Sequence, residues 1–127
     1  METFQKVILF TGVDGRAAWR DEIIELSSGS PQACLSAALP SSAYQFRFSP
    51  VGFRSEFHCT GSPQWVFILS GIMEIGLQDG SSRQFKPGEH FYSADLLPQG
   101  AVFDGQVHGH YSRQVGVEPL RTLFIKV

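Results

Sequence analysis

The sequence predicts an all-β domain, and three of its features support this class. Its 127 residues suit a single domain that can bury a core without disulfides or a structural metal. It contains 13 Gly, 7 Pro and 11 Phe, which indicates many turns and many flat apolar side chains. Short apolar segments recur roughly every 8–12 residues between turn signals, a spacing typical of an antiparallel barrel or sandwich.

The composition argues against several kinds of partner and location. Charged residues make up 17% of the chain and the net charge is -2, so a basic surface for nucleic acid or an anionic membrane is not expected. No apolar stretch has the length of a membrane span, and the N-terminus lacks the pattern of an export signal. Because Cys34 and Cys59 are the only cysteines, a reducing cytoplasm is the predicted location.

Two strands are predicted near the N-terminus. Residues 6–10 form a short apolar segment, and the dipeptide Asp14-Gly15 that follows is common in turns. The apolar residues within 19–26 have a spacing that suits either a helix or a strand. The segment is short for a helix, so a strand is the favoured prediction.

A half-buried strand is predicted for residues 43–48, because apolar and polar side chains alternate along it. Tyr44, Phe46 and Phe48 fall on one face, and polar side chains fall on the other. The same alternation predicts a further strand over residues 51–58.

The rest of the chain is predicted to consist of strands joined by turns, with one long loop over residues 95–105. That loop contains Pro98, Gly100 and Gly105, which favour irregular structure. The expected strands are 64–69, 72–77, 83–85, 90–93, 106–113 and 120–127.

Four histidines are the main candidates for chemistry. A polar side chain that points into a small β-barrel needs a hydrogen-bond partner, a ligand or a metal, because an unpaired one is costly to bury. His108 and His110 are two residues apart, so on a regular strand both would face the same way. The alternative for His58, His108 and His110 is a structural role, while His90 is expected to face solvent or a subunit contact.

The order of these features resembles that of the cupin superfamily over residues 43–127. Segments 65–71 and 85–89 carry the best part of the resemblance. The first is an apolar stretch that ends in Ser-Gly, and the second contains Pro-Gly-Glu. The resemblance implies a double-stranded β-helix, a jelly-roll barrel with one pocket at its mouth. It also implies one cupin domain over residues 1–127, with extra N-terminal strands in 1–42, and a homodimer that pairs through such strands.

The resemblance implies a metal site, although the match to the cupin ligands is incomplete. His58 falls on the first His position, whereas Thr60 and Gln64 fall where a second His and a Glu would stand. His110 is the better match to the third His, and His108 competes with it. A divalent Fe, Mn, Ni or Zn ion would be bound by His58, Gln64, His108 and His110. The missing imidazole and carboxylate weaken such a site, so a metal-free pocket is the alternative.

A proton-transfer pair is also predicted from the same part of the chain. Asp95 begins the long loop, where it serves either as a turn-forming residue or as a pocket carboxylate. In the second case it would be the acid–base partner of His110, or the fourth metal ligand in place of Gln64. An aromatic-lined pocket would suit a small apolar or aromatic metabolite. The residues expected to line this substrate pocket are Thr60, Phe46, Phe48 and Phe67.

Three hypotheses about function follow from these residues. The favoured one is a small cupin-like protein that binds a small metabolite, with or without a divalent metal. The second is a metal-dependent dioxygenase, isomerase or decarboxylase, in which an open coordination position polarises the substrate. The third is a non-catalytic sensing or structural dimer, which the departures at Thr60 and Gln64 favour. Phosphate-binding and dinucleotide-binding motifs and a nucleophile elbow are absent from the sequence.

Overall fold

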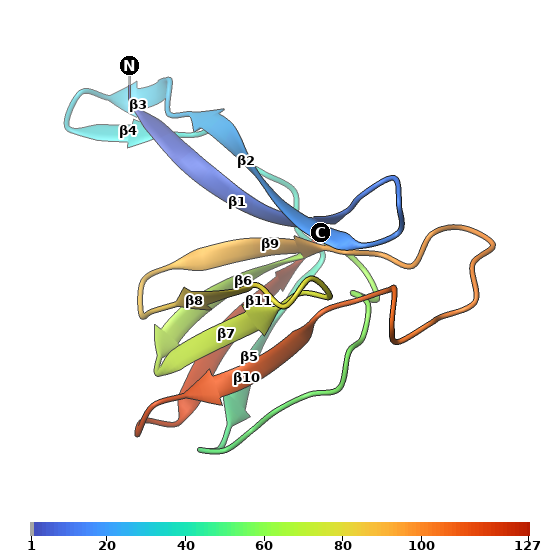
Figure 1. The fold of residues 1–127 in the computed structure, drawn as a ribbon. Coiled ribbons are helices and arrows are strands. Elements are labelled where there is room, and N and C mark those ends of the chain that lie inside the picture. Colours follow the sequence, from blue (N-terminus) through green and yellow to red (C-terminus); the bar gives the residue numbers. More distant parts are fainter. Residues whose placement is uncertain (1) are drawn as a thin grey trace.

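The computed structural model describes residues 2–127, and within that range the chain folds into eleven β-strands and no helix (Figure 1). The all-β prediction is therefore confirmed. The range also contains no helix that could cross a membrane, and the cytoplasmic location stays a prediction. The strands are β1 (Thr3–Thr11), β2 (Ala17–Glu25), β3 (Ser28–Ser30), β4 (Ala33–Leu35), β5 (Ala43–Ser49), β6 (Gln64–Ser70), β7 (Ile72–Gly76), β8 (Ser82–Phe85), β9 (His90–Ala94), β10 (Tyr111–Val115) and β11 (Leu120–Lys126).

Two facing sheets form the body of the molecule. Six strands lie in the order β2-β1-β9-β6-β11-β5, and three lie in the order β10-β7-β8. Neighbouring strands are antiparallel, except that β1 runs parallel to β9. The two sheets face each other but are not closed into a continuous barrel, and we call the two together the open barrel, or barrel for short (Figure 1). The core and the candidate site lie between them.

The core follows from the alternation of side chains along the strands. In β6, Val66 and Ile68 point inward and are buried, whereas Trp65, Phe67 and Leu69 between and beside them point to the other side of the sheet. We call that other side, which faces away from the three-stranded sheet, the outer face. The remaining core residues come from both sheets and include Leu9, Met73, Ile75, Phe85, Phe91 and Leu120.

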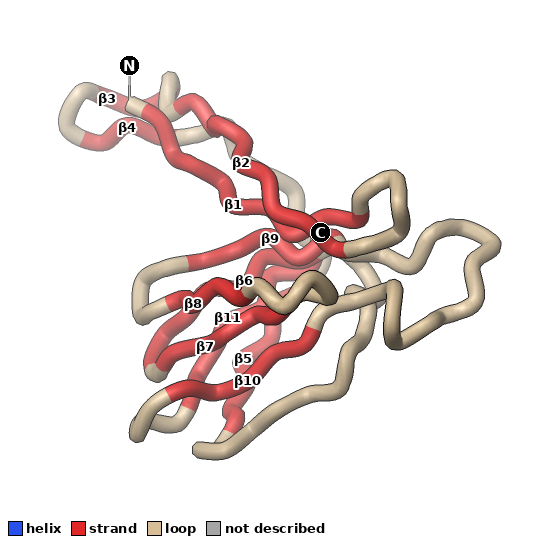
Figure 2. The backbone as a smooth tube through the Cα atoms, in the orientation of Figure 1, coloured by secondary structure: helices blue, strands red, loops and turns tan. Residues whose placement is uncertain are grey.

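The N-terminal hairpin β1–β2 has two parts with different surroundings. Its inner part pairs with β9 and contributes Val7, Leu9 and Ala17 to the core. Its distal part, residues 2–6 and 22–35, extends away from the barrel and ends in the small β3–β4 hairpin (Figures 1 and 2). We call this distal part the arm. The strand prediction for residues 19–26 is confirmed, because β2 covers most of that segment.

The strand predicted for residues 51–58 is wrong. In this segment only Arg54 and His58 form isolated bridges, to Arg113 and His110 respectively. A turn at Pro50 to Phe53, in which Gly52 has φ of 90°, interrupts the extended backbone after β5. The segment therefore crosses the open end of the barrel as an irregular chain, which brings His58 to the site.

Candidate functional site

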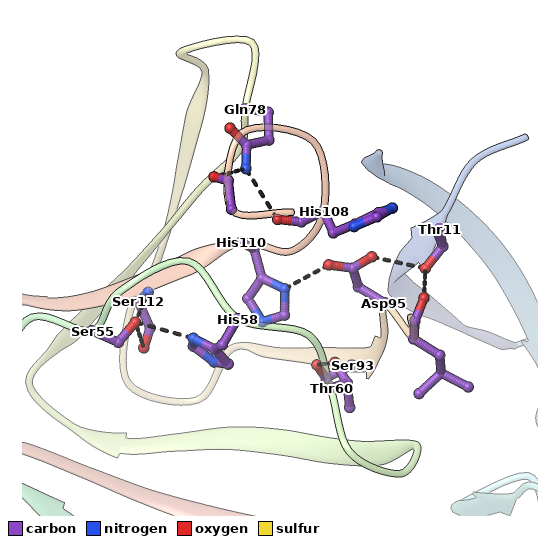
Figure 3. A network of polar contacts seen from close by, with 12 residues as sticks. Thr11, Ser55, His58, Thr60, Gln78, Ser93, Asp95, His108, His110 and Ser112 are labelled. Carbon is purple, nitrogen blue, oxygen red and sulfur yellow. Dashed lines mark hydrogen bonds and ion pairs between the residues drawn. The ribbon is translucent and has the colours of Figure 1, made fainter. Parts of the chain in front are cut away.

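Two irregular segments meet at one end of the barrel and bring His58 beside His110. The backbone N–H of each histidine donates a hydrogen bond to the carbonyl of the other, at 2.9 and 3.0 Å. The two imidazole rings are 4.8 Å apart between centroids (Figure 3). Gly109 permits this approach, because it has φ of 85° and an added Cβ would lie 2.6 Å from the carbonyl oxygen of His58.

His110 forms a buried pair with Asp95, which is 0% exposed to solvent. Nδ1 of His110 lies 2.8 Å from Oδ2 of Asp95, and Oδ1 of Asp95 accepts a hydrogen bond from Oγ1 of Thr11 at 2.8 Å (Figure 3). An ionised Asp95 accepts a hydrogen bond from Nδ1–H of His110, so Nε2 of that imidazole carries no proton and keeps its lone pair. Thr11, Asp95 and His110 thus hold one imidazole in a fixed orientation.

His110 and His58 border a cavity of about 150 Å³ between the sheets. A cavity of this size suits a molecule with few heavy atoms. Its apolar lining comes from core strands, among them Val66, Met73 and Phe91. Its polar lining comprises Arg47, His58, Cys59, Thr60, Gln64, Ser93, His110 and Ser112.

His58 lies at the rim of this cavity, and its environment favours the neutral imidazole. Partial burial lowers the pKa of His58 below its ordinary value. The charge of Arg47, and that of His110 when it is protonated, lower the pKa further, while Asp95 raises it. The hydrogen bond from Nδ1 to the carbonyl of Glu56, at 2.8 Å, also raises the pKa. His58 is therefore neutral at neutral pH, with Nδ1 donating to Glu56 and Nε2 able to accept a hydrogen bond.

Thr60 and Gln64, the two positions that depart from the cupin metal ligands, both line the cavity. Thr60 is buried, and its hydroxyl is 2.7 Å from the hydroxyl of Ser93 on β9. Gln64 begins β6 directly opposite Ser93. The structure therefore brings together His58, Thr60, Gln64, Asp95 and His110 from distant parts of the sequence.

His108 does not join this group, contrary to the prediction that it faces the same way as His110. The two residues precede β10, and Gly109 between them turns the chain. Nδ1 of His108 accepts a hydrogen bond from the backbone N–H of Asp104 at 3.0 Å, and its ring packs beside Gly15. The regular strand assumed for residues 106–113 begins only at Tyr111.

The donors in the cavity do not fit the four-ligand metal site that the resemblance implied. Within residues 2–127 no group of three or more His, Cys, Asp or Glu side chains is arranged to bind a metal ion. Without His108, the predicted ligands are two imidazoles with either the Gln64 amide or Asp95. Both carboxylate oxygens of Asp95 are already bonded, one to His110 and one to Thr11. Divalent transition metals favour several imidazoles together with an anionic ligand.

The aromatic lining predicted for the pocket must also be corrected. Phe46, Phe48 and Phe67 lie on the outer face, while Arg47 between the first two points inward to the cavity. Alternation correctly separates the two faces of β5. The polar face is the one that lines the cavity, because this end of the interior holds the buried hydrogen-bonding groups.

Sequence reasoning missed Thr11 and Ser93 as members of the site. Thr11 contacts Asp95 because β1 pairs in parallel with β9, a contact between residues far apart in the chain. A single threonine at the end of a strand carries no local signal of that pairing. Ser93 shows the alternation of an inward strand position, but its partner Thr60 comes from an irregular segment.

Comparisons with known proteins concern the fold. No protein-family model matches the sequence, and no curated protein matches it. Among solved structures, the chain is similar to the cupin domain of Cnp3 from Schizosaccharomyces pombe, with 17% sequence identity and a TM-score of 0.49. The match covers 98% of this chain and 83% of that chain. The strand arrangement described above is the all-β jelly roll expected from the cupin resemblance. The similarity to the solved structure is one of fold alone.

Proposed function

We propose that the cavity binds a small carboxylate. The observation that supports this proposal is Arg47, which lines the cavity and forms no ion pair with a carboxylate within residues 2–127. Its guanidinium lies over the rings of Phe53 and Phe124, 4.8 and 5.9 Å from their centroids. A half-buried cation without an anionic partner favours an anionic ligand, since pairing offsets the cost of its burial.

The size of the cavity restricts the ligand further. A volume of about 150 Å³ is below the range of roughly 300–1,000 Å³ found for sites of drug-sized ligands. A carboxylic acid of two to four carbons is therefore the class that we propose, in place of the apolar or aromatic metabolite expected from the sequence. His58, Gln64 and Ser112 are available to bond its remaining polar atoms.

Proton transfer is a second candidate function of the same cavity, and the Asp95–His110 pair favours it. A carboxylate that accepts a hydrogen bond from Nδ1–H orients the imidazole and stabilises its charged form. Nε2 of His110 can therefore take a proton from a bound molecule. Asp95 would be the orienting partner and His110 the general base. The metal-dependent enzyme implied by the cupin resemblance has a separate test, which is element analysis of protein purified without chelators.

Calorimetric titration with acetate, pyruvate and malonate tests the carboxylate proposal, with acetamide and acetone as neutral analogues at matched ionic strength. We expect the carboxylates alone to bind, and Arg47→Gln to weaken binding about tenfold or more, because a charge-assisted pair is lost. Arg54→Gln is the matched control, since Arg54 is exposed and lies over Tyr111 outside the cavity. Equal binding of neutral analogues, or unchanged affinity in Arg47→Gln, contradicts the proposal.

A further inference from the structure

The two imidazole rings beside the cavity offer it hydrogen-bond acceptors. Nδ1 of His58 donates to the carbonyl of Glu56, and Nδ1 of His110 donates to Asp95. A neutral imidazole carries one proton, so Nε2 of each ring is left as an acceptor. Within residues 2–127 the hydrogen bonds of both rings are made by Nδ1, and no group donates to either Nε2.

Both acceptors are within reach of a molecule in the cavity. The two rings line it, and their centroids are 4.8 Å apart, so one small group can lie against both. In the described part of the chain, the one wholly buried side-chain nitrogen or oxygen without a partner is Oγ of Ser70, so Nε2 of His110 is accessible. Figure 3 shows Nδ1 of His110 turned to Asp95 and the rest of the ring on the side of His58.

A negative charge lies directly behind one of these acceptors. Asp95 is fully shielded from water and pairs with His110 at 2.8 Å, so its charge acts through the imidazole on a group that lies against Nε2. Solvent and salt screen the field of a buried charge only weakly. The histidine side of the cavity therefore favours a group that donates hydrogen bonds and carries a positive charge.

The cavity thus has one charge of each sign to offer to a ligand. Arg47 in its lining is positive and has no carboxylate partner within residues 2–127. Asp95 is negative, and its neutral neighbour His110 does not cancel that charge. A simple carboxylate would pair with Arg47 and leave Asp95 uncompensated. A ligand that carries both an anionic and a cationic group compensates both charges, which offsets the cost of holding them away from water.

We propose that the ligand is a small amino acid in its zwitterionic form, a refinement that rests on the proposed binding of a carboxylate in this cavity. Its carboxylate pairs with Arg47, and its ammonium group donates to Nε2 of His58 and of His110. An ammonium group has three N–H donors and can serve both imidazoles at once, whereas a hydroxyl has one proton and serves one. The cavity of about 150 Å³ limits the molecule to the same two to four carbons.

Calorimetric titration of the native chain with matched ligands tests the proposal. Three sets differ in a single group: glycine, acetate and glycolate; alanine, propionate and lactate; β-alanine, propionate and 3-hydroxypropionate. We expect at least one amino acid to bind about tenfold or more tightly than both of its matched acids, because only the ammonium group forms charge-assisted hydrogen bonds to the two imidazoles. Glycinamide, which keeps the ammonium group and lacks the carboxylate, should bind more weakly than glycine.

The variant Asp95→Asn tests the role of the buried charge. Asparagine keeps an oxygen that accepts the bond from Nδ1 of His110 and removes the negative charge. The preference for an amino acid over its matched acid should fall about tenfold, while acetate should bind at least as well as before. Asp14→Asn is the matched control, since Asp14 is exposed in the turn between β1 and β2, outside the cavity lining. Circular dichroism melts report whether each variant is folded, and the comparison of ligands in the native chain needs no variant.

The outcomes separate this proposal from the carboxylate site on which it rests. Amino acids that bind no more tightly than their matched acids overturn the amino-acid proposal, as do hydroxy acids that bind equally well, and the carboxylate site then stands on the binding of the acids. Absence of binding by every carboxylate, amino acids included, overturns both. An unchanged preference in folded Asp95→Asn overturns the pairing of the ammonium group with the buried charge.

Discussion

At the residue scale, Asp95 depends on both of its side-chain partners. A carboxylate that is wholly shielded from water is stable in its ionised form only when hydrogen bonds satisfy its oxygens. His110 satisfies one oxygen and Thr11 the other. The Thr11 hydroxyl also lies 2.8 Å from the carbonyl of Leu96, but its single proton can serve only one acceptor at a time.

Replacing Thr11 by valine should therefore destabilise the protein by about 1–3 kcal/mol, the usual cost of leaving a buried polar group unpaired. Valine keeps the shape of threonine and removes only the hydroxyl. Thr11→Ser restores the donor and should recover most of the lost stability. Urea unfolding of the two variants measures the difference, and equal destabilisation by both would show that the methyl group matters more than the hydrogen bond.

The surroundings of His90 predict how the stability of the folded protein depends on pH. Nε2 of His90 accepts a hydrogen bond from the backbone N–H of Val7 at 3.3 Å, which requires that nitrogen to be unprotonated. Burial lowers the pKa of His90 below its ordinary value, Arg83 and Lys6 lower it further, and Glu89 opposes them. The folded state thus binds fewer protons than the unfolded state as the pH falls below about 6.5.

Stability that is fully present above about pH 6.5 should therefore decline as the pH falls through the lowered pKa of His90. His90→Gln removes the titrating group and keeps a side chain that can accept the bond from Val7. Its unfolding midpoint should fall less between about pH 7 and pH 5.5 than that of the native chain. Parallel pH profiles in the two proteins would assign the acid sensitivity elsewhere, with His58 as the next candidate because its pKa is also lowered.

At the scale of the elements, alternation in the sequence predicted the strands but not which side faces the interior. In β5 the period of two separates Phe46 and Phe48 from Arg47, as expected. Which of these two sets of side chains faces the interior depends on the strands opposite β5. At this end of the barrel those strands supply polar partners. The long-range contact of Thr11 with Asp95 and the turn at Gly109 depend in the same way on tertiary structure, so local patterns do not reveal them.

Gly109 provides the test at this scale, because it joins the two halves of the site. Alanine there would combine an unfavourable positive φ with a Cβ 2.6 Å from the carbonyl oxygen of His58. Gly100 has a similar φ of 79° and open space around an added Cβ, so Gly100→Ala is the matched control. We expect Gly100→Ala to cost about 1 kcal/mol and Gly109→Ala clearly more.

Urea unfolding gives these stabilities, and nuclear Overhauser effects between the rings of His58 and His110 report whether the site persists. The two rings should separate in Gly109→Ala and stay together in Gly100→Ala. Equal costs in the two variants would mean that the close approach of the two segments contributes little to stability.

At the scale of the whole molecule, the N-terminal hairpin links the cavity to the outer face. Its inner end carries Thr11, which reaches Asp95. Its distal end carries Phe4 and Ile24, which border an apolar groove of about 410 Å³ on the outer face. Residues 8–10 pair with β2 on one side and β9 on the other, whereas residues 3–6 pair with β2 alone. The inner end is therefore held by strand pairing on both sides. The distal end is held on one side by β2 and on the other only by side chains, with Phe4 against His90 and Lys6 over Tyr92.

Amide hydrogen exchange should show this difference between the two ends of β1. The amides of Phe4 and Lys6 should exchange at least about tenfold faster than that of Leu9, because β9 does not support them. Equal protection of all three amides would mean that the side-chain contacts of Phe4 and Lys6 hold the arm as firmly as β9 holds the inner end.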